Sequence, residues 1–276
     1  MMRIDAHQHF WQLAARAGAW PPPSLAAIHR DFAPHDLAPL LAAHGIAGTV
    51  LVQSLPSSAD TDYLLALAEK TSFIRAVVGW TDLLAMEAPA AIARLASNRK
   101  LKGLRPMLQD LDDAQWIADP ALAPALRAMA AHGLRFDALV LPRHLPALLQ
   151  CALAYPSLAI VIDHAAKPPI ADAAFGHWRE HMAQLAALPN VHCKLSGLVT
   201  EARPGWNVDE LRPYVAHVLH VFGARRVIWG SDWPVVDLAG GYAAWLVASE
   251  ALLAHLGQQD RNDIFGLNAC RFYGLE

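Results

Sequence analysis

Two histidines, His7 and His9, lie two positions apart in the apolar run of residues 4–11. Because a β-strand sends alternate side chains to opposite faces, both imidazoles are predicted to point the same way from one strand end. Such a pair can hold one metal ion or polarise one carbonyl group. Two polar residues where a strand enters a loop would show the same pattern, so the pair alone does not establish a site.

Other polar side chains recur where short β-type runs end: Arg105, Asp137, His164, Lys194, Ser196 and Asp232. A lone charge at a buried strand end is costly unless it is paired or bound to a ligand. Several such residues converging on one mouth are difficult to explain as packing. They predict a functional site at one end of a sheet.

The β-type runs are predicted at residues 3–7, 48–53, 74–80, 101–105, 134–140, 158–164, 191–196 and 226–232. Between them lie helical stretches at 36–43, 60–70, 88–96, 120–131, 145–154, 178–187 and 211–222. Such alternation indicates parallel strands joined by helical crossovers. Eight units predict a single-domain (β/α)₈ TIM-type barrel of distorted form over residues 1–276. A doubly wound sheet is the alternative, but no Gly-x-Gly-x-x-Gly follows the first strand.

Composition limits the functional classes. Hydrophobic residues make up 55% of the 276 residues and charged residues 17%, which is enough for a large core. A net charge of −3 without a basic block disfavours nucleic-acid binding. The polar start is unlike a signal peptide, and no apolar run of about 18 residues predicts a membrane span. The scattered cysteines 151, 193 and 270 suggest free thiols in a reducing cytoplasm.

Two connections are unusually long, at residues 10–34 after the first strand and 197–209 after the seventh. Loops longer than about 12–15 residues in a compact domain are often functional. In a barrel both would lie at the C-terminal face, where active sites occur. Surface decoration is the alternative explanation.

Each candidate residue suits a particular role. Asp232 beside two imidazoles can complete a divalent-metal site with His7 and His9, or remove a proton from water. His164 can be a third ligand or can stabilise a developing oxyanion. Arg105 is expected to act with His164 as a catalytic cation that stabilises the oxyanion. The expected substrate-binding set combines Lys194, the tryptophans Trp11 and Trp233 that could form a pocket floor, and Gln53 and Asp137.

Taken together, these motifs resemble the amidohydrolase superfamily, and within it the branch that contains sugar lactonases. The resemblance spans nearly the whole chain, and it rests on residues 5–11, 78–80, 162–164, 167–168, 193–198 and 230–235. It implies a distorted barrel that opens a sugar-acid lactone, with Asp232 activating water. It also implies a small-molecule lactone substrate. It implies one divalent metal ion, with zinc as the first candidate, although some members of the branch work without a metal.

Two departures from the family pattern bear on the number of metal ions and on the substrate. Members with two bridged metals carry a lysine or glutamate on strand four and a histidine on strand five, where this chain has Arg105 and Asp137. A bridged two-metal centre is therefore not expected. Relatives also often have Arg-His at the end of strand four, whereas Pro106 follows Arg105 here and offers neither donor nor ligand.

Three alternatives stay open at this point. One is hydrolysis of a dicarboxylate ring-fission lactone of the pyrone or muconolactone type, which the cations Arg105 and Lys194 would permit. A decarboxylase on the same barrel would need more histidine ligands. A non-catalytic binding barrel would not need a base at Asp232. The oligomeric state, including a homo-oligomer, is left undecided.

Overall fold

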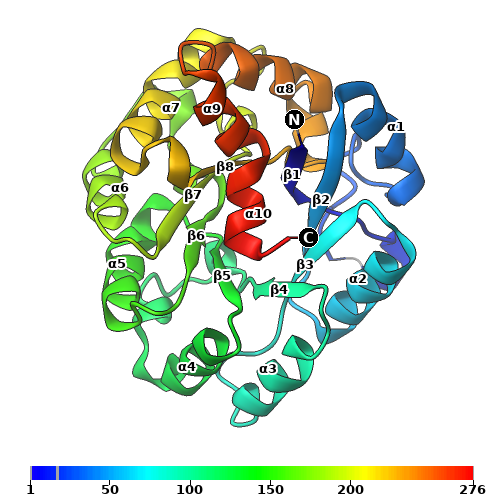
Figure 1. Cartoon of the computed structure of the whole chain (residues 1–276), viewed down its shortest axis with the longest axis vertical. Coiled ribbons are helices and arrows are strands. Elements are labelled where there is room, and N and C mark those ends of the chain that lie inside the picture. Colours follow the sequence, from blue (N-terminus) through cyan, green and yellow to red (C-terminus); the bar gives the residue numbers. More distant parts are fainter. Residues whose placement is uncertain (1, 17–18, 276) are drawn as a thin grey trace.

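The computed structural model describes residues 2–16 and 19–275. Eight parallel strands lie in chain order within one sheet. They are β1 (Arg3–Gln8), β2 (Ile46–Val52), β3 (Ile74–Gly79), β4 (Leu101–Leu104), β5 (Arg135–Ala138), β6 (Ile160–Ile162), β7 (Val191–Leu195) and β8 (Val227–Trp229). Together with the helices between them they form a nearly closed ring (Figure 1). The predicted (β/α)₈ barrel is confirmed.

The crossover helices surround the sheet: α1 (Pro34–His44), α2 (Ser58–Lys70), α3 (Ala88–Ala96), α4 (Ala123–Ala131), α5 (Leu145–Ala154), α6 (Trp178–Ala186), α7 (Val208–Phe222) and α8 (Gly241–Leu252). Local chemistry fixes several ends. The Ser57 hydroxyl accepts the amide of Ala59 at the start of α2, and Asn207 accepts two amides at the start of α7. Gly45 in the left-handed region ends α1.

Several predicted boundaries differ from the structure by a few residues, and three of the differences have a clear local cause or move a site residue. The helix expected from residue 120 begins as α4 at Ala123, because Pro120–Leu122 forms a separate 3₁₀ turn. β6 ends at Ile162 rather than at residue 164, because the chain turns into the left-handed region from His164 onward. β8 ends at Trp229, so Asp232 lies on the loop beyond the strand and not on it.

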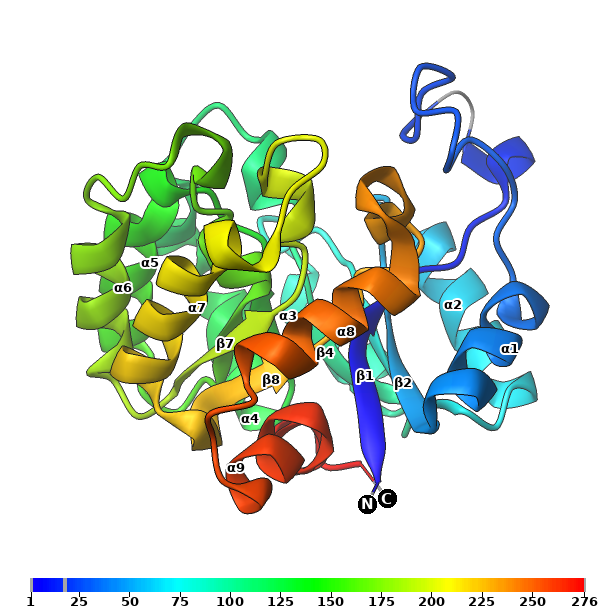
Figure 2. The same ribbon diagram turned by 90° about the horizontal axis from the view of Figure 1, so that it is seen from above.

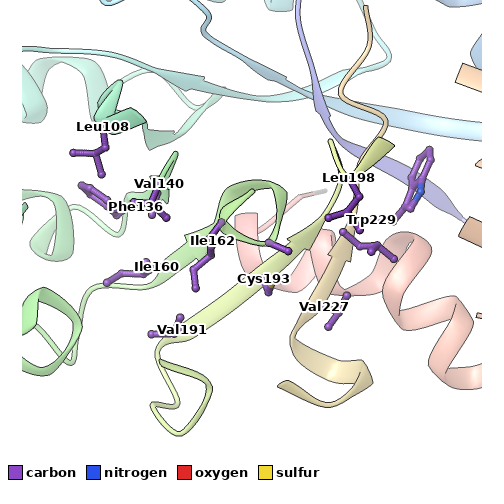
Figure 3. Packing of buried hydrophobic residues seen from close by; sticks show 14 of the residues in the cluster. Leu108, Phe136, Val140, Ile160, Ile162, Val191, Cys193, Leu198, Val227 and Trp229 are labelled. Atoms are coloured by element: carbon purple, nitrogen blue, oxygen red, sulfur yellow. The ribbon is translucent and has the colours of Figure 1, made fainter. Parts of the chain in front are cut away.

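Alternating residues divide the core into two layers. Inward-facing side chains such as Ile4, Ala6, Val50 and Val52 fill the barrel interior. Outward-facing side chains pack against the helices, and Figure 3 shows part of that layer. Helix α8 has no counterpart in the predicted elements, and neither do the last helices, α9 (Gln258–Asn262) and α10 (Asn268–Tyr273). In Figure 2 these last two helices lie at the end of the barrel where the chain starts, and Phe272 of α10 packs into the interior.

The ring is irregular where its two ends meet. β1 and β8 share no continuous ladder, and beyond β8 the chain meets β1 through the bridge between Gln8 and Trp233. The amide of Asp232 donates to the carbonyl of His7 at 2.8 Å. A Cβ on Gly230 would lie 2.7 Å from the Cβ of His7, so only glycine allows this approach. The seam therefore places Asp232 beside the histidine pair.

The two long connections lie at the same end of the barrel, opposite to α9 and α10 (Figure 2). Cysteines 151, 193 and 270 are free thiols. Across residues 2–16 and 19–275, no helix combines the length and the apolarity that crossing a membrane requires.

His192 on β7 gives the fold a predictable acid sensitivity. Burial, with Arg226 and Arg135 nearby, lowers its pKa from 6.5 to about 4. The unfolded chain therefore binds the proton more readily between these two values, and stability falls as the pH falls through that range. We expect His192→Leu to make the decline in unfolding free energy shallower by about 1 kcal/mol per pH unit there. Urea unfolding at several pH values measures this, and parallel slopes for both proteins would contradict it.

Candidate active site

Three imidazoles converge on one carboxylate oxygen at the C-terminal face. The Oδ1 atom of Asp232 lies 3.3 Å from Nε2 of His9, 3.7 Å from Nε2 of His7 and 3.9 Å from Nε2 of His164. The ring centroids of His7 and His9 are 4.9 Å apart, and those of His7 and His164 are 4.5 Å apart. All four side chains are almost fully buried. The prediction that His7 and His9 lie side by side is confirmed.

Electrostatics keep this group in one charge state at neutral pH. Burial by itself would raise the pKa of Asp232, but His164, His9 and His7 outweigh that effect and hold it well below its usual range. Burial lowers the pKa of His9, and it lowers the pKa of His164 to about 4. The site therefore presents an ionised carboxylate among neutral imidazoles.

The tautomer of His9 follows from its contacts. Its Nδ1 lies 2.7 Å from the carbonyl oxygen of Val52, which only accepts hydrogen bonds, so Nδ1 carries the hydrogen. In the neutral ring Nε2 then keeps a lone pair that faces Asp232 Oδ1 at 3.3 Å. Two acceptors this close need a proton or a cation between them, and burial disfavours the proton.

His164 is held by an uncommon backbone turn. Residues 164–167 all lie in the left-handed region, with φ between 48° and 60°. Consecutive non-glycine residues in this region are strained, and such strain is typically retained at functional sites. The hydroxyl of Ser196 lies 2.9 Å from Nδ1 of His164. Donation by that hydroxyl leaves the hydrogen on Nε2, the atom that faces Asp232.

A glycine behind His164 gives a sharp test of this placement. Gly197 has φ +62°, and a Cβ there would lie 2.5 Å from Nδ1 of His164. We expect Gly197→Ala to lower kcat at least about tenfold, since displacing a catalytic group by about 1 Å has effects of this size or larger. Gly205→Ala is the matched control, because Gly205 has φ +79° and no atom within 4 Å of its Cβ position. Equal losses in the two variants would show that backbone strain, and not displacement of His164, is responsible.

Arg105 lies next to His7 and Asp163 at the edge of this cluster. Its guanidinium donates to the carbonyl of Gln53 and, at 3.3 Å, to Oδ2 of Asp163. Its Nη1 also lies 3.4 Å from Nε2 of His7. The side chain is 3% exposed, so its charge acts on the cavity while both terminal nitrogens already contact protein groups.

Beneath His7 lies a fully buried charge network. The ammonium of Lys194 lies 2.6 Å from Asp137 Oδ2, 3.0 Å from Asp163 Oδ1 and 3.1 Å from Nδ1 of His7. The hydroxyl of Tyr273 on α10 donates to Asp137 at 2.6 Å. Burial opposes ionisation of Asp163, but Lys194 and His7 reverse this and lower its pKa, whereas burial raises the pKa of Asp137. The network fixes the orientation of His7 from below.

A second buried carboxylate fixes the loop that carries Asp232. Asp5 accepts hydrogen bonds from the amide and the hydroxyl of Ser231, at 2.8 and 2.6 Å, and from the amide of His7. Burial raises the pKa of Asp5 to about 6. These contacts bind β1 to the residue before Asp232, so they position the carboxylate relative to the histidines.

Asp232 and the imidazoles of His9 and His164 line a cavity of about 400 Å³. Its lining contains both polar and apolar side chains: His9, Ser54, Arg105, Gln109, Asp110, His164, Lys167, Thr200, Glu201 and Asp232, with Trp20, Leu25, Leu55, Pro56, Met107, Leu139, Val235 and Leu238. The volume and the mixed lining suit a small polar ring compound. Both long connections contribute residues, as their position at the C-terminal face predicts.

Some of the predicted site residues line the cavity and others are buried away from it. Asp232, His164, Arg105 and His9 line the cavity, while His7, Lys194 and Asp137 lie beneath it. Gln53 is fully buried and donates from its amide to the carbonyl of Arg105 at 2.7 Å. As buried groups, Lys194, Asp137 and Gln53 are placed to position the site and do not line its surface.

The two tryptophans also differ from the expected pocket floor. Trp11 is fully buried, donates to the carbonyl of Arg30 at 2.8 Å, and packs against Trp20 and Phe32. Trp233 packs against Phe32 as well, with 2% exposure. Both lie behind the cavity wall, where Trp20 is the tryptophan among the lining residues. Trp11 packs against Trp20, which lines the cavity, but Trp11 itself does not line it.

Sequence reasoning missed Asp163 and gave Glu201 and Lys167 no role in the site. Asp163 is a carboxylate directly before His164 at the end of β6, so the same argument from strand-end charge could have identified it. Lys167 and Glu201 gave no comparable signal, because each lies on a loop and their meeting depends on the tertiary fold.

The donor set suits one divalent metal ion. His7, His9 and Asp232 offer two imidazole nitrogens and a carboxylate oxygen, all within 4.8 Å of one another, and a second group combines His7, Asp163 and His164. Two imidazoles and one carboxylate with an open side are a common catalytic zinc arrangement. With its hydrogen on Nδ1, neutral His9 has Nε2 free to bind a metal ion on the side that faces Asp232.

Comparisons with known proteins agree with this geometry. A family model described as amidohydrolase matches residues 4–275. A curated L-fucono-1,5-lactonase of Burkholderia ambifaria is 59% identical over 278 residues, covering 99% of this chain and 96% of that protein. Another L-fucono-1,5-lactonase, of Burkholderia multivorans, is 38% identical over 289 residues, with the same coverages. The crystal structure of an amidohydrolase from Burkholderia multivorans with bound zinc superposes with a TM-score of 0.93 at 36% identity, over all of both chains. The chain belongs to the amidohydrolase family.

Proposed function

We propose that this protein is a carboxylic-ester hydrolase that opens a sugar 1,5-lactone, with L-fucono-1,5-lactone as the first candidate. The observation that carries the proposal is the ionised carboxylate of Asp232, ringed by three imidazoles at the base of a cavity large enough for one sugar ring. The substrate follows from the two Burkholderia lactonases that resemble the chain from end to end.

Asp232 acts as the general base. Its carboxylate is ionised at neutral pH and reaches the cavity, so it can accept a proton from a water molecule that attacks the lactone carbonyl. Attack gives a tetrahedral oxyanion. Collapse of that intermediate breaks the ring C–O bond, and the proton held by Asp232 becomes available to the departing alkoxide.

His164 and Arg105 stabilise the oxyanion. With its Nδ1 facing the Ser196 hydroxyl, neutral His164 offers an N–H from Nε2 at the cavity surface. Arg105 contributes a fixed positive charge at the same surface. Preorganised donors of this kind act where charge develops in the transition state. The buried groups Lys194, Asp137 and Gln53 hold His7 and Arg105 in place.

His7, His9 and Asp232 are the residues that would hold one zinc ion. When bound, such an ion lowers the pKa of water and polarises a carbonyl group. The chain's own contribution is to hold the three donor atoms together and to fix the tautomer of His9 through the carbonyl of Val52.

The test is a pH-indicator assay of the purified protein on a panel of neutral aldonolactones and dicarboxylate lactones, before and after chelation. We expect turnover of neutral 6-deoxy sugar lactones. Turnover that survives chelation would show that the side chains suffice, and loss restored by zinc would show that His7 and His9 are ligands. Silence on every neutral lactone would overturn the proposed function.

Two further predictions concern the cellular setting. Unpaired thiols at cysteines 151, 193 and 270 are what a reducing compartment predicts, so we propose a cytoplasmic enzyme of carbohydrate metabolism. We propose no macromolecular partner beyond a homo-oligomer, for which sedimentation of the purified protein is the direct measurement.

A further inference from the structure

We propose that the ion pair between Lys167 and Glu201 restricts the cavity to uncharged lactones, and that Glu201 is the residue that excludes lactones bearing a carboxylate. The inference rests on the proposed function, because it concerns specificity at the same cavity. It assigns a specificity-determining role to two residues that take no part in the proposed chemistry.

The pair joins two loops at the C-terminal face. Lys167 ends the left-handed turn that carries His164 after β6, and Glu201 ends the 3₁₀ turn Val199–Glu201 after β7. The Lys167 ammonium lies 3.6 Å from Oε1 of Glu201, with 23% and 25% of the two side chains exposed. Both residues line the cavity. A ligand reaching this wall therefore meets an ammonium and a carboxylate together.

Recognition of a substrate carboxylate would need an available cation. Arg105 and Lys167 are the arginine and lysine among the cavity-lining residues of the described chain. Arg105 is 3% exposed and already donates to Gln53 and Asp163. Lys167 is the more accessible cation, and Glu201 already neutralises it. A carboxylate could gain Lys167 only by displacing Glu201 as its partner.

The negative charges of the site strengthen this exclusion. Burial raises the pKa of Glu201, Lys167 opposes that rise, and the charge of Asp232 adds to it, so the two carboxylates already interact. A substrate carboxylate beside Lys167 would bring a third negative charge to this wall. Repulsion between like charges weakens binding of a carboxylated lactone, whereas a neutral lactone does not experience it.

Neutral sugar lactones meet no such barrier. A ring hydroxyl can donate to the carboxylate of Glu201 and accept from the ammonium of Lys167 without a net charge. The wall thus favours hydroxyl and other uncharged substituents over a carboxylate.

The test uses two matched ligands: L-fucono-1,5-lactam, in which nitrogen replaces the ring oxygen and hydrolysis is negligible, and the same lactam with a carboxylate in place of its methyl group. Calorimetry measures both dissociation constants. We expect the native protein to bind the neutral lactam at least about tenfold more tightly. Glu201→Gln is expected to reduce this preference about tenfold, mainly through tighter binding of the carboxylated lactam.

Three variants serve as controls. Glu201→Asp keeps the charge and is expected to keep the preference. Asp110→Asn removes another carboxylate of the lining, one with no ion pair to Lys167, and should also keep it. Adding Lys167→Met to Glu201→Gln should abolish the gained affinity. An unchanged preference in Glu201→Gln, or an equal loss in Asp110→Asn, would overturn the inference. The proposed function would stand in either case if the native protein still hydrolyses neutral lactones.

Discussion

Asp232→Asn is expected to lower kcat for sugar lactone hydrolysis about a thousandfold or more, because the amide cannot accept the proton of the attacking water. Asparagine has the same shape and also tolerates the left-handed backbone that Asp232 adopts at φ +61°. The amide can still donate toward the lone pair of His9. Fold and cavity should therefore persist while the chemistry is lost. Steady-state kinetics on the most active lactone of the panel gives the measurement.

Asp237→Asn is the matched control for Asp232→Asn. Asp237 lies in the next turn of the same loop, outside the cavity lining, and neutralising it should leave kcat within about twofold. Melting temperatures of the two variants would show whether either has lost stability. Activity of Asp232→Asn within a few-fold of the native protein would exclude the general-base role. Restoration of that variant by added zinc would instead indicate that Asp232 serves as a ligand.

Lys194→Met should produce the second large effect, on stability. Lys194 is the cation shared by Asp137 and Asp163, and all three side chains are fully buried. Removing one partner of a buried ion pair typically costs about 3–5 kcal/mol, since it leaves charge without compensation. We expect a loss of that size in the free energy of unfolding, measured by urea denaturation. A loss below about 1 kcal/mol would contradict the assigned network.

A double variant separates charge from packing in this network. Asp137→Asn removes one of the two carboxylates that Lys194 neutralises, so the combination with Lys194→Met should regain part of the lost stability. The double variant should still show a reduced kcat, because Nδ1 of His7 has lost its contact with Lys194 at 3.1 Å. Full recovery of kcat together with stability would show that the network serves folding alone.

Local sequence was informative where each side chain acts from its own strand. His7 is on β1 and His9 comes directly after Gln8, the last residue of that strand, and their rings are neighbours, as alternation along an extended chain predicts. Alternation of eight strands with helices predicted the barrel, and the barrel in turn placed Arg105, His164 and Asp232 at one mouth. Element ends were less predictable, since the left-handed turn at His164 shortens β6.

Adjacency in sequence was misleading for the tryptophans. Trp11 follows the histidine pair and Trp233 follows Asp232, yet their rings pack together with Phe32 behind the cavity wall. Direction and burial of a side chain on a loop depend on which other loops cover it. The hydrogen bond from Trp11 to Arg30, nineteen residues further on, is such a contact.

The chemical groups of the site, and the architecture that brings strand ends together, follow from periodicity and residue type. The partner of each group, in contrast, depends on the tertiary structure. The convergence of three Nε2 atoms on Asp232, the sharing of Lys194 between Asp137 and Asp163, and the pairing of Lys167 with Glu201 each join separate loops or strands. Such pairings depend on strand register and on the closure of the seam between β1 and β8, which no local pattern encodes.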